Sequence, residues 1–159
     1  MKKKLLLALF IGGVVLTLTG CGKKEIKGPF TINCEGVDND QLGVKQTIIS
    51  SYNFGQDQYL TNYSIKTVSI YENDEAYKIY RDSAFDAKED SEESSLEYNV
   101  ASDDETKTVT VEYKITIDKT DLDASDDKDF YKAASVLERA KSNTNVKCAF
   151  DGVEESQIK

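Results

Sequence analysis

The chain has 159 residues, of which 39% are hydrophobic, and it carries a formal net charge of −9 with no histidine and no tryptophan. Such an acidic surface repels phosphate groups, which excludes nucleic-acid binding. Without histidine, the Ser-His-Asp and Cys-His catalytic arrangements are excluded, as are zinc sites that need imidazole.

The first twenty residues have the pattern of an export signal. Lysines occupy positions 2 to 4, an almost entirely apolar run extends from residue 5 to residue 18, and Thr19 and Gly20 precede Cys21. This run is too short for a membrane-spanning helix, which needs about 20 apolar residues. We therefore expect residues 1–20 to be a signal peptide that is removed from the mature chain.

The stretch Leu18-Thr19-Gly20-Cys21 resembles the lipobox of bacterial lipoproteins. The resemblance implies a diacylglyceryl group on the sulfur of Cys21, with fatty acids such as palmitate. It also implies a location at the outer face of a cell membrane, in a host that the lysine-rich residues after Cys21 suggest is Gram-positive. Two acyl chains are enough for stable anchoring. A plain secretory signal, or an uncleaved anchor with an incidental cysteine, is the alternative.

Residues 21–29 then form the lipidated N-terminus and a tether, and residues 30–159 form a single extracytoplasmic domain. Loss of residues 1–20 removes three lysines, which lowers the formal charge of the mature chain to −12. The tether is short, because eight extended residues reach roughly 28 Å. The domain is therefore expected close to the lipid headgroups.

The other two cysteines, Cys34 and Cys148, are an even pair in a compartment where thiols oxidise. Each alternates with polar residues and shares its phase with apolar neighbours, which places both on the apolar faces of short strands at the two ends of the domain. If these strands are neighbours, the thiols can form a disulfide. Two separate buried thiols are the alternative.

Hydrophobic alternation predicts further strands at residues 44–54, 59–71, 96–100 and 107–118. Helical periodicity predicts a helix from Asn73 or Asp74 to about Lys88, and a second from Asp126 or Asp127 to Asn143. The expected fold is α+β, with a mainly antiparallel sheet in the order β-β-β-α-β-β-α-β and two helices that cover one face in a two-layer arrangement.

Across roughly residues 44 to 123, this succession of elements, with the stretch VTVEYKITIDKTDL, resembles small uncharacterised lipoproteins of the YehR type. The resemblance is one of pattern and implies no catalytic residues.

Carboxylates are in excess, but their spacing indicates no metal site and no cofactor. An EF-hand loop counted from Asp121 has Asp126 where glycine is required, and one counted from Asp38 has Ile49 where a bidentate glutamate is required. Most acidic runs are expected to be solvated, which would keep their pKa low and leaves no evident acid for glycoside hydrolysis.

The nine tyrosines suggest a contact surface instead. Tyr71, Tyr77 and Tyr80 gather near the start of the first helix and are the candidate contact residues, because tyrosine offers rigid amphipathic area. Packing in the core with the hydroxyls at the rim is the alternative.

We expect a non-catalytic binding or accessory module at the membrane surface, with a protein or a cell-wall polymer as partner. A small-ligand carrier with an enclosed apolar cavity and a carboxylate-based hydrolase are the alternatives.

Overall fold

The structure is a computed structural model that describes residues 25–39, 43–91, 96–142 and 145–159. The predicted signal peptide and the predicted lipidation site at Cys21 lie outside the described residues. The described elements, in chain order, are β1 (Phe30–Asn39), β2 (Val44–Phe54), β3 (Leu60–Tyr71), α1 (Asp74–Asp90), β4 (Leu96–Asp103), β5 (Thr108–Thr116), α2 (Lys119–Ala124), the 3-10 turn η1 (Lys128–Tyr131), α3 (Ala133–Lys141), β6 (Val146–Asp151) and the 3-10 turn η2 (Glu155–Gln157).

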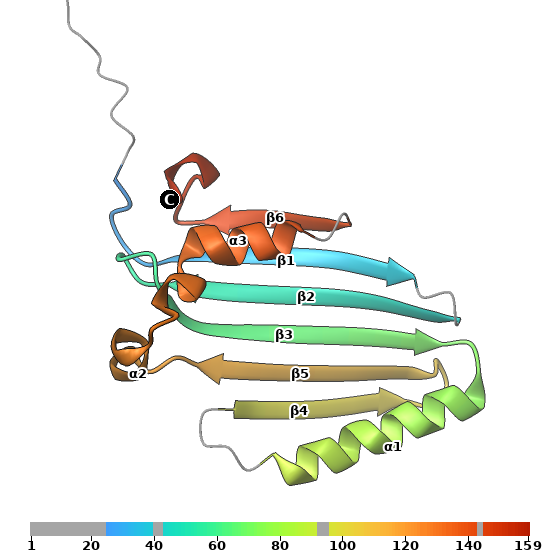
Figure 1. Ribbon diagram of the computed structural model, residues 1–159. Coiled ribbons are helices and arrows are strands. Elements are labelled where there is room, and N and C mark those ends of the chain that lie inside the picture. The colour runs from blue at the N-terminus through green and yellow to red at the C-terminus, as the bar shows by residue number, and fades with distance from the viewer. Residues whose placement is uncertain (1–24, 40–42, 92–95, 143–144) are drawn as a thin grey trace, which may run out of the picture.

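The six strands form one antiparallel sheet in the order β4-β5-β3-β2-β1-β6 (Figure 1). The strands at the two ends of the domain, β1 and β6, are neighbours, and this is the condition that the predicted disulfide required. The antiparallel sheet and the mixed α+β composition are confirmed, with three helices in place of the two expected.

The first helix begins where its sequence indicates. The side-chain oxygen of Asn73 accepts hydrogen bonds from the backbone N–H groups of Glu75 and Ala76, at 2.8 and 3.1 Å. These bonds satisfy two of the donors that an N-terminus leaves unpaired. On the covered side of α1, Tyr77 and Ala84 are buried.

The second predicted helix is wrong in its continuity, because the α-helix of this segment begins only at Ala133. In place of one helix from Asp126 or Asp127, the chain forms η1 directly after Asp127 and then α3, while the additional helix α2 precedes this segment. The break occurs because Lys132 is extended, with φ −69° and ψ 145°, and forms a β-bridge with Tyr59. The backbone N–H of Ala133 donates to the carbonyl oxygen of Gln58 at 2.9 Å. Pairing with the segment before β3 thus replaces helical hydrogen bonds at this point.

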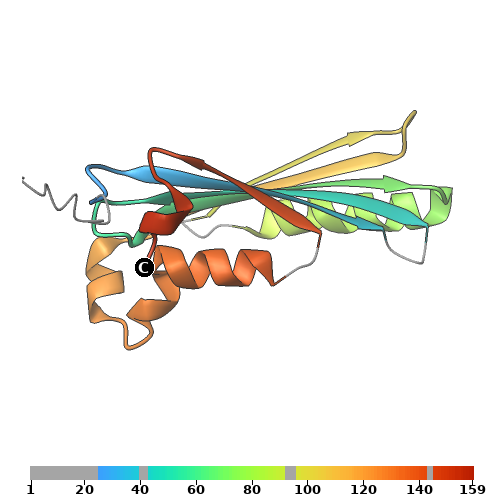
Figure 2. The ribbon, with the colours of Figure 1, turned by 90° about the horizontal axis from the view of Figure 1, so that it is seen from above.

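The core consists of two clusters on one face of the sheet. One lies under α3 and includes Ile32, Phe54 and Leu137, and the other lies under α1 and includes Tyr77 and Val109. Figure 2 shows α1 and α3 on the same side of the sheet. We call this side the helix-side face.

The opposite face carries the alternate residues of each strand, such as Asn33 and Glu35 in β1 and Glu112 in β5, which are exposed. None of the described helices covers it (Figure 2). We call it the open face.

Candidate functional site

The two cysteines predicted to pair do so. Cys34 of β1 and Cys148 of β6 are direct cross-strand partners, and their sulfur atoms are 2.08 Å apart. Cys34 is 3% exposed and belongs to the cluster under α3. The disulfide is therefore confirmed, and it ties the C-terminal edge strand to the first strand of the domain.

The three tyrosines predicted as a contact surface lie together, but mostly inside the protein. Their rings are neighbours, with the centroid of Tyr71 6.3 Å from that of Tyr77 and 5.4 Å from that of Tyr80. Tyr71 and Tyr77 are 6% and 3% exposed, whereas Tyr80 is 36% exposed. For Tyr71 and Tyr77 the core-packing alternative holds, because both belong to the cluster under α1 with Val109 and Val111. Tyr80 alone of the three offers substantial surface.

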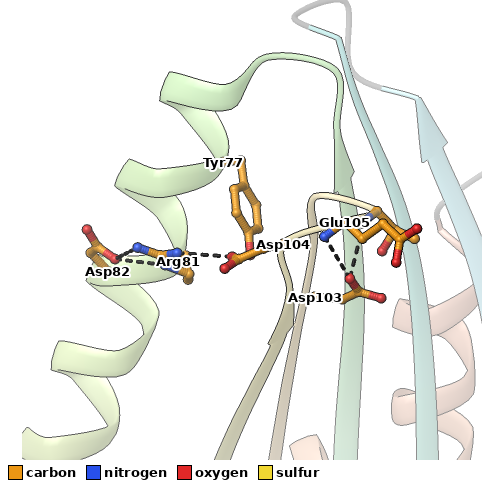
Figure 3. A network of polar contacts seen from close by, with 7 residues as sticks. Tyr77, Arg81, Asp82, Asp103, Asp104 and Glu105 are labelled. Carbon is orange, nitrogen blue, oxygen red and sulfur yellow. Dashed lines mark hydrogen bonds and ion pairs between the residues drawn. The ribbon is translucent and has the colours of Figure 1, made fainter.

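The hydroxyl of Tyr77 belongs to a polar network that links α1 to the turn between β4 and β5 (Figure 3). It donates to Oδ1 of Asp104 at 2.5 Å, and Nη1 of Arg81 donates to the same oxygen at 3.0 Å. The Tyr77 hydroxyl and then the Arg81 guanidinium hold the pKa of Asp104 below its usual value. The network is internally satisfied in this way, and we interpret it as a structural clasp for α1.

The turn itself is built by neighbouring side chains. Oδ1 of Asp103 accepts hydrogen bonds from the backbone N–H groups of Glu105 and Thr106, at 2.9 and 3.2 Å (Figure 3). The ammonium group of Lys107 lies 2.6 Å from Oδ1 of Asp74 at the start of α1. These contacts position Asp104 for the clasp.

A row of four other tyrosines crosses the helix-side face from one core cluster to the other. Tyr52 of β2 and Tyr63 of β3 are direct cross-strand partners, as are Tyr113 of β5 and Tyr98 of β4. The ring centroids are 6.2 Å apart for Tyr52 and Tyr63 and 6.4 Å apart for Tyr63 and Tyr113. Tyr52 and Tyr63 pack against the cluster under α3, and Tyr98 packs against the cluster under α1. We call these residues the tyrosine row.

All four members of the tyrosine row are half-buried. Burial, and next the proximity of Tyr131 and Tyr52, raises the pKa of Tyr63. Burial, followed by the nearby phenols of Tyr63, Tyr52 and Tyr98, likewise raises the pKa of Tyr113. The hydroxyls of Tyr63 and Tyr113 are therefore protonated at neutral pH, and each can both donate and accept a hydrogen bond.

A groove of about 310 Å³ adjoins the row at Tyr52 and runs between α3 and the strands β1 and β2. Its lining is mixed, with Ile48 and Ala140 among the apolar residues and Asp38 and Arg139 among the charged ones. The guanidinium carbon of Arg139 lies 3.5 Å from the ring centroid of Phe130. Its Nη2 also donates to the carbonyl oxygen of Phe130 at 2.6 Å, so the side chain of Arg139 is held in place. We call this feature the α3 groove.

No family model, no curated protein and no solved structure matches this chain.

The arrangement of the carboxylates in the described part of the chain bears on the metal and hydrolase hypotheses. No group of three or more acidic or cysteine side chains there is arranged to hold a metal ion. Five aspartates have a displaced pKa, and each is lowered by hydrogen bonds: Asp74, Asp103, Asp104, Asp118 and Asp123. A general acid for glycoside hydrolysis needs a raised pKa, so none of these five is suited to that role.

Sequence reasoning did not single out the tyrosine row. Each member lies at an apolar position in the alternation of its strand, where the local pattern predicts an ordinary core residue. The signal was available in Tyr98 and Tyr113, which share the phase of Val100 and Val111 in two adjacent strands. The strand order and the register were needed to place Tyr52 and Tyr63 beside them.

Among the described residues, no helix has both the length and the apolar character needed to cross a bilayer.

Proposed function

We propose that the protein is an extracytoplasmic binding module without catalytic activity. A lipid on Cys21 anchors it to the outer face of the cell membrane. The lipobox pattern and the preceding signal segment support the anchor, and the confirmed disulfide agrees with an oxidising compartment. The two-layer arrangement expected from the sequence, with α1 and α3 on one face of the sheet, is part of this proposal.

The observation that carries the binding role is the tyrosine row. Four adjacent strands contribute it, and its rings are half-buried where the cover of α1 and α3 is incomplete. Tyrosine provides rigid contact area at low conformational cost and is enriched where proteins bind one another. We therefore assign the row as the contact surface for a protein partner at the same membrane, with a wall polymer as the other outcome of the test.

A small-ligand carrier is the second candidate, and the α3 groove favours it. Its volume of about 310 Å³ lies at the lower end of the range for small-molecule sites, about 300 to 1,000 Å³. The charged groups of Asp38 and Arg139 in its lining suit a polar ligand better than the apolar one expected from the sequence.

The test of the binding role is photo-crosslinking in intact cells. A photoreactive amino acid replaces Tyr113 in one variant and Ile79 in the control, because Ile79 is 62% exposed on α1 and lies outside the row. A discrete protein adduct from position 113, absent from position 79, supports the module. Adducts with lipid or wall polymer alone at position 113 contradict the protein-partner role.

The anchor is tested separately by mass spectrometry of the mature chain. The proposal requires an acylated Cys21 at the N-terminus and release of a Cys21→Ser variant into the medium. An unmodified thiol at Cys21 in native material refutes it.

A further inference from the structure

The open face carries apolar side chains that nothing in the described part of the protein covers. Ile49 of β2 and Ile70 of β3 are 40% and 43% exposed. Between them a continuous row of β-branched and small residues crosses five paired strands. Its members, in order from β1, are Val37, Thr47, Val68, Thr110 and Ala101. Exposed isoleucines beside a strip of β-branched and small side chains, bordered by charges, suit an interaction surface.

The same face is nearly neutral, although the whole chain has a formal charge of −9. Side chains that share the phase of this row carry four lysines and five carboxylates, a net charge of −1. They are Lys45, Lys66, Lys114 and Lys147 with Glu35, Glu97, Asp103, Glu112 and Asp151. Two strongly acidic surfaces would repel each other, whereas two copies of this face would not.

We propose that the open face binds a second copy of this chain, about a two-fold axis that runs close to the strand direction between β3 and β5. This axis places β3 against β5 of the second copy, and β2 against β4 of the second copy. By the observed register, Lys66 then faces Glu112 of the second copy, and Lys45 faces Asp103 of the second copy. Because the interface is isologous, each pair occurs twice.

Three further facing pairs are compatible with this axis. Val68 meets Thr110 of the second copy, Ile70 meets Thr108, and Ile49 meets Asn99, since each pair occupies the same level along the strands. The pairing leaves no like charges opposite each other in the four overlapping strands.

Two neighbouring positions of the axis are disfavoured by charge. An axis along β3 would set Lys66 against Lys66 of the second copy. An axis between β2 and β3 would set Glu35 against Glu112 of the second copy. Like-charge contacts of this kind cost several kcal/mol at an interface and suppress the wrong register. Of the three positions compared, charge favours the axis between β3 and β5.

The area of the overlap indicates a reversible dimer. Four strands about 4.8 Å apart, each with about nine residues rising 3.3 Å, give a flat area of about 570 Å² on each copy. The total of roughly 1,100 Å² lies at the lower limit for a specific interface. We expect the dimer to depend on protein concentration and to form most readily among chains confined to one membrane.

The orientation also suits the tether, an argument that rests on the proposed lipid anchor. An axis parallel to the strands keeps β1 pointing the same way in both copies, so residue 25 lies at the same end of each. Both anchors can then reach one bilayer. An axis across the strands would place the two tethers at opposite ends of the dimer.

The test is sedimentation equilibrium of the full mature chain in density-matched detergent, with charge reversals on the open face. Lys66→Glu places two acidic pairs in the interface and should weaken the dimer at least tenfold, and Lys45→Glu should do the same at the second pair. Lys66→Glu combined with Glu112→Lys should restore the wild-type dissociation constant. Lys147→Glu is the matched control, because Lys147 lies on the open face but its strand, β6, is outside the overlap. This variant should leave dimerisation unchanged.

Circular dichroism of each variant checks that the fold is kept. Lys45→Glu is a second test of the interface. Within one chain Lys45 lies three strands away from Asp103, so an effect of this pair on dimerisation reports a contact between copies. A wild-type chain that stays monomeric at about 0.5 mM would overturn the proposal. So would reversals at Lys66 and Lys45 that leave the dimer intact, or an equal loss with Lys147→Glu. None of these results depends on acylation of Cys21 or on the tyrosine row, so the proposed function stands or falls separately.

Discussion

Removal of the Cys34–Cys148 disulfide is the most quantitative perturbation that the structure offers. The bond joins residues with a sequence separation of 114. In the chain-entropy model, opening a loop of this length frees the unfolded chain and lowers the free energy of unfolding by about 4.8 kcal/mol at 25 °C. With a urea m-value of about 1 to 3 kcal/mol per molar, this corresponds to a fall in the midpoint of about 1.6 to 4.8 M.

The assay is urea unfolding of the oxidised chain, the reduced chain and a Cys34→Ala/Cys148→Ala variant. The reduced chain keeps both sulfur atoms in place, so its comparison with the double variant separates packing of the buried Cys34 from loss of the cross-link. Hydrogen exchange should also show that β6 loses protection first, because the bond ties this edge strand to β1. A loss below about 1 kcal/mol in the reduced chain would refute the loop-entropy reasoning.

Three further predictions concern α1 and its surroundings. Asn73→Ala removes the cap of α1 and should cost about 1 kcal/mol in the free energy of unfolding, whereas Asn73→Asp, which keeps an acceptor, should cost less. Tyr77→Phe removes the donor to Asp104. Because the pKa of Asp104 is lowered in the folded state, its contribution to stability is present above its unfolded pKa and is lost as the pH falls through the folded pKa. The loss of unfolding free energy in Tyr77→Phe should therefore be clear at neutral pH and shrink in acid. An equal loss of stability in Tyr77→Phe at neutral and at acidic pH would contradict this. Burial raises the pKa of Tyr71 to about 12. The contribution of this shift to the stability of the fold is therefore complete below the unfolded pKa of tyrosine, near 10, and is lost as the pH rises towards 12. Phenolate absorbance should show that Tyr71 ionises at a higher pH than the other tyrosines, and a single transition for all tyrosines would argue against this.

Local sequence patterns predicted most of the secondary structure correctly. The period-two alternation of β5, with Val109, Val111 and Tyr113 on one face, is the alternation that the sheet shows. The start of α1 followed from the capping chemistry of Asn73, which acts within three residues of the chain. These features depend on contacts between near neighbours, and such contacts can be read from spacing.

The second predicted helix failed because distant residues decided its course. The apolar spacing of Phe130, Ala133 and Leu137 suits a helix, but the backbone of Lys132 pairs with Tyr59. As a result Phe130 is 53% exposed, while Ala133 and Leu137 are buried. Helical periodicity cannot reveal a competing bridge more than seventy residues away.

The sequence by itself determined which residues of β5 face the core, the placement of Cys34 and Cys148 on the apolar faces of their strands, and the acidic character of the chain, because alternation and charge are properties of the local chain. The tertiary structure alone decided which strands are neighbours. The tyrosine row and the facing charges of the open face follow from that order, since each requires side chains from several strands at one level of the sheet, and strand register is set by long-range pairing.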